Sequence, residues 1–259
     1  MKYLLYNKVK RLLLLLVGCW GLSHVAVAQV GEYRTDFAVG VNGGYTFSSV
    51  NFLPKVPQGM LQGTTGGLTV RYTCEKYFKS ICAIVAELNY SQLGWKEEQL
   101  TEKDEPVINY ETGLSEQYSR KISYIQLPIF ARMGWGRERR GFQFYFQVGP
   151  QLGYFISENS EANFDFHNPN IYERVSPVVK QYDMPVENKL DYGIAGGLGL
   201  EFSNRHVGHF LLEGRYYYGL GNLYGNSKRD YFAISNFQNI TVKLSYLFDI
   251  VKTKNPKIK

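Results

Sequence analysis

Beyond its first 28 residues the sequence has no apolar run of the ~18 residues that a membrane-spanning helix needs. It has no helical period of apolar residues, and it lacks a phosphate-binding loop, a nucleophile elbow and a dinucleotide fingerprint. Histidine and cysteine are scarce, at four and three residues. These absences exclude a helical membrane protein and give little support to enzyme chemistry.

What the sequence does contain is an alternation of apolar and polar residues in short runs. Between residues 142 and 154 every second residue is apolar, and the residues between are glutamine, tyrosine or glycine. Side chains on a β-strand point alternately to opposite faces, so one face of this strand is apolar and the other is polar and small. The pattern recurs and predicts strands over residues 36–47, 63–76, 81–95, 118–134, 142–156, 189–203, 209–221 and 238–249.

The predicted connections alternate in length. The joins at 77–80, 135–141 and 204–208 are short, and those at 48–62, 96–117, 157–188 and 222–237 are long. Outer-membrane barrels have short periplasmic turns, long outer loops and an even number of strands. The loop lengths therefore favour such a barrel over a soluble sandwich.

The orientation of the two faces distinguishes a membrane barrel from a soluble one. A soluble eight-stranded ligand barrel would turn its apolar face inward and its charges outward. Here the charges and glycines share one face, while the other is nearly free of charge and carries aromatic residues near the strand ends. The sequence therefore predicts an all-β fold, an eight-stranded antiparallel up-and-down transmembrane β-barrel in the lipid of the bacterial outer membrane.

The start of the chain has the features of a secretory signal peptide. Basic residues precede an apolar core at 12–17, and Ala26-Val27-Ala28 forms a cleavage site. We expect cleavage after Ala28, a barrel domain over 29–250 and a basic periplasmic tail over 251–259. The segment ending in Cys19 also matches a lipoprotein box, which would instead leave a lipidated Cys19 at the new N-terminus.

Removal of the signal peptide changes the charge of the protein. Residues 1–28 hold four basic and no acidic residues, so the formal charge falls from +6 to +2 (6 − 4). No basic patch suited to nucleic acid remains. We expect outer-membrane lipid, and no nucleic acid, among the partners.

Cys74 and Cys82 lie symmetrically about Phe78, with strand pattern on both sides. In a hairpin centred on Phe78 they would face each other, and an oxidising compartment permits a disulfide. Closing so short a loop would stabilise the fold by about 2–3 kcal/mol. We expect this disulfide; the alternative is two free thiols that pack as small apolar side chains.

The inward face carries charged residues that allow two interpretations. A ring of unpaired charges would suit a pore for small solutes. In a barrel of eight strands, however, side chains fill the interior and buried charges must pair. We therefore expect a plug made by a lumen charge network, whose members are Arg71, Glu87, Arg132, Glu201, Glu213, Arg215 and Lys243.

The long loops differ from the short turns in charge. The 96–117 loop is acidic, with seven carboxylates against two lysines, whereas the short turns and the tail are basic. The 157–188 loop combines aromatic residues and prolines with charges, and loops of this length without regular structure are often functional. We expect it to pack on the barrel mouth or to meet a partner.

We expect no catalytic residues, no cofactor and no metal. A barrel hydrolase needs a nucleophile beside a base, and none of His167, His206 and His209 has a strand serine and a carboxylate at an evident spacing. Two histidines at one turn, His206 and His209, are a weak signal for a metal. A lipid-modifying enzyme would need a serine–histidine–carboxylate cluster at one rim.

Three segments resemble PorT-like outer-membrane proteins of the Bacteroidota, namely residues 123–132 (SYIQLPIFAR), 147–154 (QVGPQLGY) and 191–202 (DYGIAGGLGLEF). The resemblance implies an eight-stranded outer-membrane barrel, and the family's namesake takes part in type IX secretion. It implies a structural or accessory role in which outer loops or the periplasmic tail meet secretion-machinery or other envelope proteins. One departure is the basic tail after Phe248, because such barrels commonly end on an aromatic residue recognised for insertion.

Overall fold

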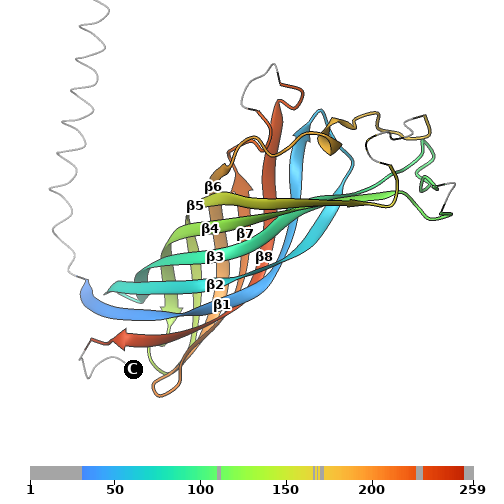
Figure 1. The fold of residues 1–259 in the computed structure, drawn as a ribbon. Helices are drawn as coiled ribbons and strands as arrows, with labels where there is room; N and C mark the ends of the chain where they lie inside the picture. The colour runs from blue at the N-terminus through green and yellow to red at the C-terminus, as the bar shows by residue number, and fades with distance from the viewer. Residues whose placement is uncertain are drawn as a thin grey trace, which may run out of the picture.

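The computed structural model describes residues 31–109, 112–165, 167, 169, 172–225 and 230–253. Eight antiparallel strands pair in chain order and close into one barrel (Figure 1), which confirms the predicted up-and-down fold. The strands are β1 Glu32–Leu53, β2 Gly59–Tyr77, β3 Ser80–Glu98, β4 Gln117–Gly136, β5 Gly141–Ala162, β6 Leu190–Asn204, β7 Gly208–Gly219 and β8 Ile234–Val251. Within the described residues no helix has the length and apolar character to cross a membrane.

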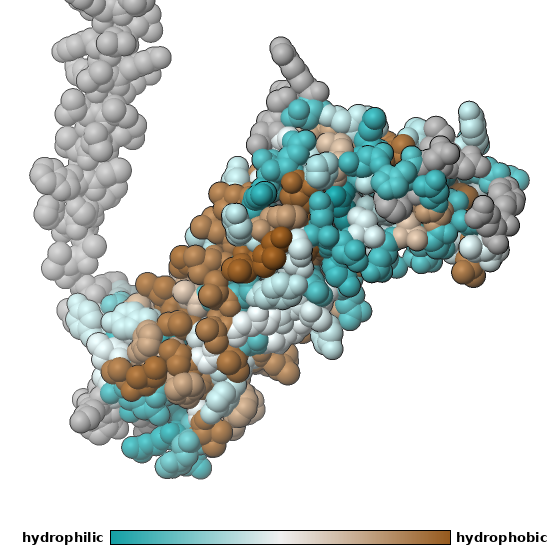
Figure 2. Space-filling view, in the orientation of Figure 1, coloured by the Kyte–Doolittle hydropathy of each residue, from teal (hydrophilic) through white to brown (hydrophobic). Residues whose placement is uncertain are grey.

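The alternation in the sequence becomes two faces of the barrel wall. On β8, Leu244 is 65% exposed and points outward, while its neighbour Lys243 is 2% exposed and points into the lumen. Exposed apolar and aromatic side chains occur on all eight strands. Figure 2 shows brown patches of hydrophobic residues on the visible face of the barrel wall. Hydrophilic residues cover the end from which β3, β4 and β5 project. The apolar face is therefore the outer one, as a lipid environment requires.

Several strands run beyond their predicted ends. β1 pairs with β2 as far as Ser48 and with β8 as far as Leu53. The first outer connection is therefore residues 54–58 and not the long loop expected over 48–62. Val50 and Phe52 continue the alternation and are buried in the barrel mouth, which explains the difference. The other outer connections, at 99–116, 163–189 and 220–233, are long as predicted.

β3, β4 and β5 continue past the rest of the barrel on the outer side (Figure 1). The ladder between β4 and β5 extends to the pair Tyr118 and Ala162, whereas the ladder between β5 and β6 stops at Tyr154 and Leu190. The three strands form a projecting sheet. Residues 156–162 of β5 lie at its edge, with no strand partner on that side in the described part of the chain.

Aromatic side chains fill the outer half of the barrel. Phe52 meets Trp95 edge-on, with ring centroids 5.3 Å apart, and Phe232 at 4.9 Å. Tyr124 meets Phe237 at 5.7 Å. Tyr118, Tyr182, Tyr217 and Tyr224 belong to the same buried cluster, which we call the aromatic layer. Large rings in edge-on contact pack closely, so the outer half of the interior is filled.

Inward glycines make room for this packing. A Cβ at Gly199 would overlap the ring of Tyr145, which is fully buried in the lumen. A Cβ at Gly40 would overlap the carbonyl group of Tyr246 on the neighbouring strand β8. Glycine at these positions permits the close approach that a narrow barrel needs.

The predicted disulfide between Cys74 and Cys82 is not formed, and both residues are free thiols. The register of β2 and β3 pairs Thr73 with Ala83 and Glu75 with Cys82. The bulge between these pairs leaves Cys74 out of the ladder, so the two cysteines are not directly opposite each other. The symmetric spacing of the cysteines predicted the position of the turn correctly, but it gave no sign of the extra residue that the bulge adds to β2.

Replacing Leu198 by arginine places a charge on the outward face near the middle of β6, where Leu198 is 57% exposed. We expect the free energy of unfolding to fall by about 2–4 kcal/mol, because hydrocarbon does not hydrate a cation. Urea titration of the barrel folded in lipid vesicles measures the change. The matched control, Asn159→Arg on the projecting sheet, should change by less than about 0.5 kcal/mol. Equal losses would contradict the assignment of the two faces.

Candidate functional site

Below the aromatic layer the lumen holds charged side chains in two groups. In the upper group Arg215 joins two carboxylates: its Nη1 and Nη2 donate to Glu87 at 3.1 and 3.0 Å, and its Nε donates to Glu213 at 2.8 Å. Lys243 donates a further hydrogen bond to Glu87. All four residues are at most 5% exposed. Two cations therefore offset two carboxylates, as burial away from water requires.

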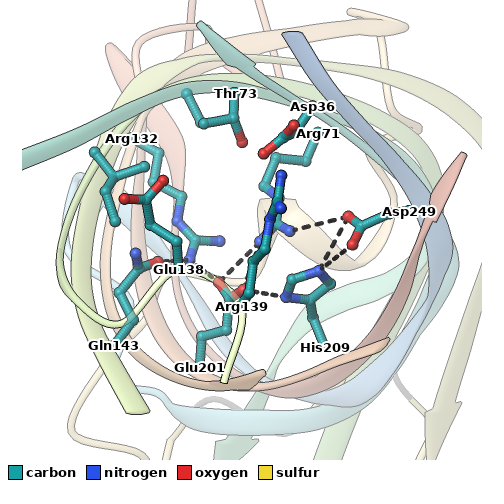
Figure 3. Close-up of a pocket in the computed structure, with 12 residues that line it drawn as sticks. Asp36, Arg71, Thr73, Arg132, Glu138, Arg139, Gln143, Glu201, His209 and Asp249 are labelled. Carbon is teal, nitrogen blue, oxygen red and sulfur yellow. Dashed lines mark hydrogen bonds and ion pairs between the residues drawn. The ribbon is translucent and has the colours of Figure 1, made fainter. Parts of the chain in front are cut away.

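In the lower group, nearer the periplasmic end, Glu201 is the common acceptor (Figure 3). Arg71 Nη1 lies 2.8 Å from both of its oxygens, and Arg132 also donates to it. His209 Nδ1 lies 2.7 Å from Glu201, and His209 Nε2 lies 3.0 Å from Asp249. A single carboxylate, 2% exposed, thus holds side chains from β2, β4 and β7 together.

The seven residues of the expected lumen charge network all lie inside the barrel, in these two groups. Each occupies an inward position of its strand, which is why the alternation identified them. The pairing itself has no sequence signal, because partners such as Arg71 and Glu201 are 130 residues apart.

A small cavity adjoins Glu201 at the periplasmic mouth (Figure 3). Its volume of about 30 Å³ has room for about two water molecules, far less than the volume of an ordinary ligand site. Arg71 and Arg139 line it together with the carboxylates of Asp36 and Asp249. The cavity therefore adjoins the lower charge group and is too small for a substrate.

The chain segment after β8 crosses this mouth. Thr253 N donates to Asp36 at 2.5 Å, and its Oγ1 accepts from the backbone of Thr35 at 2.8 Å. Arg139, in the turn between β4 and β5, donates to the Thr253 carbonyl. The start of β1, the end of β8 and a periplasmic turn thus meet at one residue. The rest of the expected tail, 254–259, lies outside the described residues, as do the signal peptide and Cys19.

Two ion pairs of Glu138 hold the turn that contains Arg139 in place. Glu138 accepts from Arg34 Nε at 2.9 Å and from Lys76 Nζ at 2.8 Å. Burial raises the pKa of Glu138, but the two cations outweigh burial and hold this pKa below its usual range. Ion pairs therefore link the rim of the barrel as well as the lumen.

The structure brings together one constellation that the sequence analysis missed. Ser203 Oγ lies 2.8 Å from His209 Nδ1, and both oxygens of Asp249 lie 3.0 Å from His209 Nε2. Ser203 and His209 flank the turn between β6 and β7 and pair directly in the ladder, which is the signal that could have located them. A serine, a histidine and a carboxylate at one rim are the cluster that a barrel hydrolase would need.

The hydrogen bonds around this cluster oppose nucleophilic catalysis. Ser203 donates its proton to Glu201 at 3.1 Å, and His209 Nδ1 also faces Glu201. Each ring nitrogen of His209 therefore faces a carboxylate, and such neighbours favour an N–H on the ring over the free nitrogen that a base for the serine would need. Ser203 is also only 1% exposed. The cluster acts as part of the lower charge group.

A second buried carboxylate fastens the long outer loop above the lipid-facing band. Glu97, near the end of β3 in the projecting sheet, accepts from Trp95 Nε1 at 2.8 Å and from the Tyr182 hydroxyl at 2.9 Å. Gln99 and Gln181 donate two further bonds to it. Burial raises the pKa of Glu97 despite these donors. The 3₁₀ turn Lys180–Tyr182 is thereby held over the barrel mouth, one of the two places expected for this loop.

The described residues contain no group of three or more histidine, cysteine or acidic side chains that could hold a metal ion. His206 is exposed on the turn between β6 and β7, whereas His209 is engaged by Glu201 and Asp249. The two histidines of this turn therefore have different surroundings, and the weak metal signal gains no further ligand.

A family model described as an outer membrane protein beta-barrel domain matches residues 27–225. The chain belongs to this family. It is accordingly an outer-membrane β-barrel protein located in the bacterial outer membrane, which confirms the predicted location. A search of curated proteins gave no match.

Several solved structures are similar to this outer-membrane barrel. Ail of Yersinia pestis, in complex with the heparin analogue sucrose octasulfate, is 15% identical with a TM-score of 0.33, covering 82% of this chain and 99% of Ail. Neisserial surface protein A is 10% identical with a TM-score of 0.40, and the match covers 82% of this chain and 97% of that protein. OprG of Pseudomonas aeruginosa is 15% identical with a TM-score of 0.36, and the match covers 84% of this chain and 98% of OprG. At these identities the likeness concerns the fold alone.

Replacing Glu201 by glutamine in this outer-membrane barrel leaves Arg71 and Arg132 buried without their carboxylate. We expect the free energy of unfolding to fall by about 3–5 kcal/mol, because two buried cations lose their shared carboxylate and Arg71 keeps only its 3.9 Å pair with Asp249. Glu98→Gln serves as the control, since Glu98 is 59% exposed in its 3.0 Å pair with Lys96 and should change stability by less than about 1 kcal/mol. Similar effects in urea titrations of both variants would show that the lumen is hydrated.

Proposed function

We propose that this protein is a non-conducting, non-enzymatic outer-membrane barrel with a structural or accessory role at the cell envelope. The observation that carries the proposal is the filled lumen. The aromatic layer and the two charge groups follow one another along the barrel axis, and their members Trp95, Arg215 and Arg71 are 0%, 5% and 6% exposed. A solute pore would need an open path lined by unpaired charges, whereas here the charges pair.

The projecting sheet supports a role in contacting partners. Asn163 N donates to the Gln117 carbonyl at 3.3 Å, so by the two-residue period of the ladder the N–H groups of Glu158, Ser160 and Ala162 are directed away from β4. An open strand edge is a template for pairing with another chain. We infer that an extended segment of an envelope protein pairs with this edge.

A role in protein secretion of the type IX kind rests on the resemblance to PorT-like proteins. The segment that carries it most clearly, 123–132, lies within β4, where Tyr124 belongs to the aromatic layer and Arg132 to the lower charge group. These residues maintain the barrel. Contact with secretion components would therefore fall to the projecting sheet and to the basic periplasmic tail.

Planar-bilayer recording tests the filled lumen directly. The purified barrel should add no single-channel steps to the baseline of a protein-free bilayer, because packed aromatic rings and paired charges block the axis. Incorporation is verified by recovering folded barrel from the same vesicles. Reproducible conductance steps from the folded protein would contradict the proposal and favour the pore for small solutes.

Affinity capture of the tagged barrel from native outer membranes tests the accessory role. We expect envelope secretion components to be retained in stoichiometric amount and to be lost with Ala162→Pro, which removes one edge N–H without touching the ladder to β4. Ala162→Ser keeps that N–H and is the matched control. A barrel recovered alone, or equal recovery with both variants, would contradict the proposed contact at the β5 edge.

A further inference from the structure

The outward face of the barrel carries a groove that neither the fold nor the proposed role requires. Its volume is about 610 Å³, and its lining is almost entirely apolar. Most lining residues, among them Phe142, Phe210 and Leu244, are exposed outward residues of β5, β6, β7, β8 and β1, so the groove lies on the wall that faces lipid. A concave site of this size is in the range of ligand-binding pockets.

Cross-strand register explains the shape of the groove. Phe142, Phe202, Phe210 and Tyr246 stand directly opposite one another on four consecutive strands and form an aromatic row. A second row of smaller outward residues lies next to it, on the side toward the bilayer interior. It consists of Leu200, Leu212, Leu244 and Gly43 on β6, β7, β8 and β1. Because the rings of the aromatic row project farther from the wall than the leucines and Gly43 beside them, a depression forms next to the rings.

The aromatic row is a firm wall. Phe142 and Phe202 have ring centroids 5.0 Å apart, and Phe210 and Tyr246 are 5.1 Å apart. The Tyr246 hydroxyl donates to the Val207 carbonyl at 2.5 Å, which ties this ring to the turn between β6 and β7. Ring contacts and this hydrogen bond fix the side chains that border the groove.

The two ends of the groove lie at different depths. Phe142 is the second residue of β5, and Phe202 lies two residues before β6 ends, so this end adjoins the periplasmic rim. Gly43 lies well inside β1, so the other end reaches toward the bilayer interior. A Cβ at Gly43 would meet only the Thr65 carbonyl, at 3.8 Å, so no contact within the protein requires glycine there.

Two cations lie in the periplasmic turns that adjoin the strand ends at this side of the groove, Arg140 between β4 and β5 and Arg205 between β6 and β7. Arg140 precedes Phe142 by two residues, and Arg205 follows Phe202 by three. Both side chains are exposed, and neither forms an ion pair with any residue that the structure describes. An apolar groove that begins beside two cations matches a molecule with a hydrocarbon chain and an anionic head.

We propose that this groove is a binding site for a glycerophospholipid of the periplasmic leaflet. One acyl chain lies along the groove from the aromatic row to Gly43, and Arg140 and Arg205 bind the phosphate. Because hydrocarbon surrounds the wall, shape match and headgroup charge, and not the hydrophobic effect, select the ligand. An anionic headgroup should be preferred by roughly fivefold for each cation.

Native mass spectrometry of the purified barrel, titrated with phosphatidylglycerol or phosphatidylethanolamine, tests the site. We expect one tightly bound lipid and a preference for phosphatidylglycerol. Gly43→Leu fills the groove and should weaken binding at least tenfold. The matched control is Gly196→Leu, an outward glycine on β6 away from the groove, whose Cβ would have no neighbour closer than 3.7 Å.

The headgroup is tested separately. The double variant Arg140→Gln/Arg205→Gln should abolish the preference for phosphatidylglycerol, whereas Lys79→Gln, an exposed cation on the turn between β2 and β3, should preserve it. If Gly43→Leu does not fold, Leu244→Trp fills the groove from a side chain that is already 65% exposed.

Equal lipid binding by the groove variants and by Gly196→Leu would overturn the proposal and reduce the groove to part of a general lipid annulus. A barrel dimer that is lost in Gly43→Leu, with lipid binding unchanged, would also overturn it and assign the groove to a second copy of the chain.

Discussion

The narrow interior of an eight-stranded barrel is the constraint on which the rest of this structure depends. With almost no room for water, every inward charge must meet an opposite charge or several hydrogen-bond donors. Glu201 and Glu87 each gather cations from distant strands, and Glu97 gathers neutral donors instead. The inward residues therefore act as sets, and removing one member alters the environment of the others.

Different side chains fill the two halves of the interior. Aromatic rings close the outer half, where the long loop docks through Glu97 and Arg120, which donates to the Gln181 carbonyl at 2.8 Å. Ion pairs close the periplasmic half and extend into the rim through Glu138. Because side chains fill the axis, the surfaces on which the proposed contacts are placed are the projecting sheet, the rim and the lipid-facing wall.

The sequence predicted the fold well because period-two alternation is a local signal. It placed Lys243 inward and Leu244 outward without any knowledge of their neighbours. It misjudged Cys74, since a single bulge shifts the register and has no local signature there. It also missed Ser203 with Asp249, whose proximity arises from ladders between β6, β7 and β8. Contacts across the lumen depend on shear and closure, and neither can be read from one strand at a time.

The pairing of β1 with β8 bears on how the barrel is made. Phe37 and Val251 are ladder partners although they are 214 residues apart (251 − 37), and Thr253 then ties the same two chain regions together. Until β8 arrives, two strand edges carry unpaired backbone groups that hydrocarbon cannot satisfy. Closure and entry into the bilayer are therefore coupled. A ribosome must finish almost the entire chain, and the periplasm must hold it soluble, before any part of it can become a stable membrane protein.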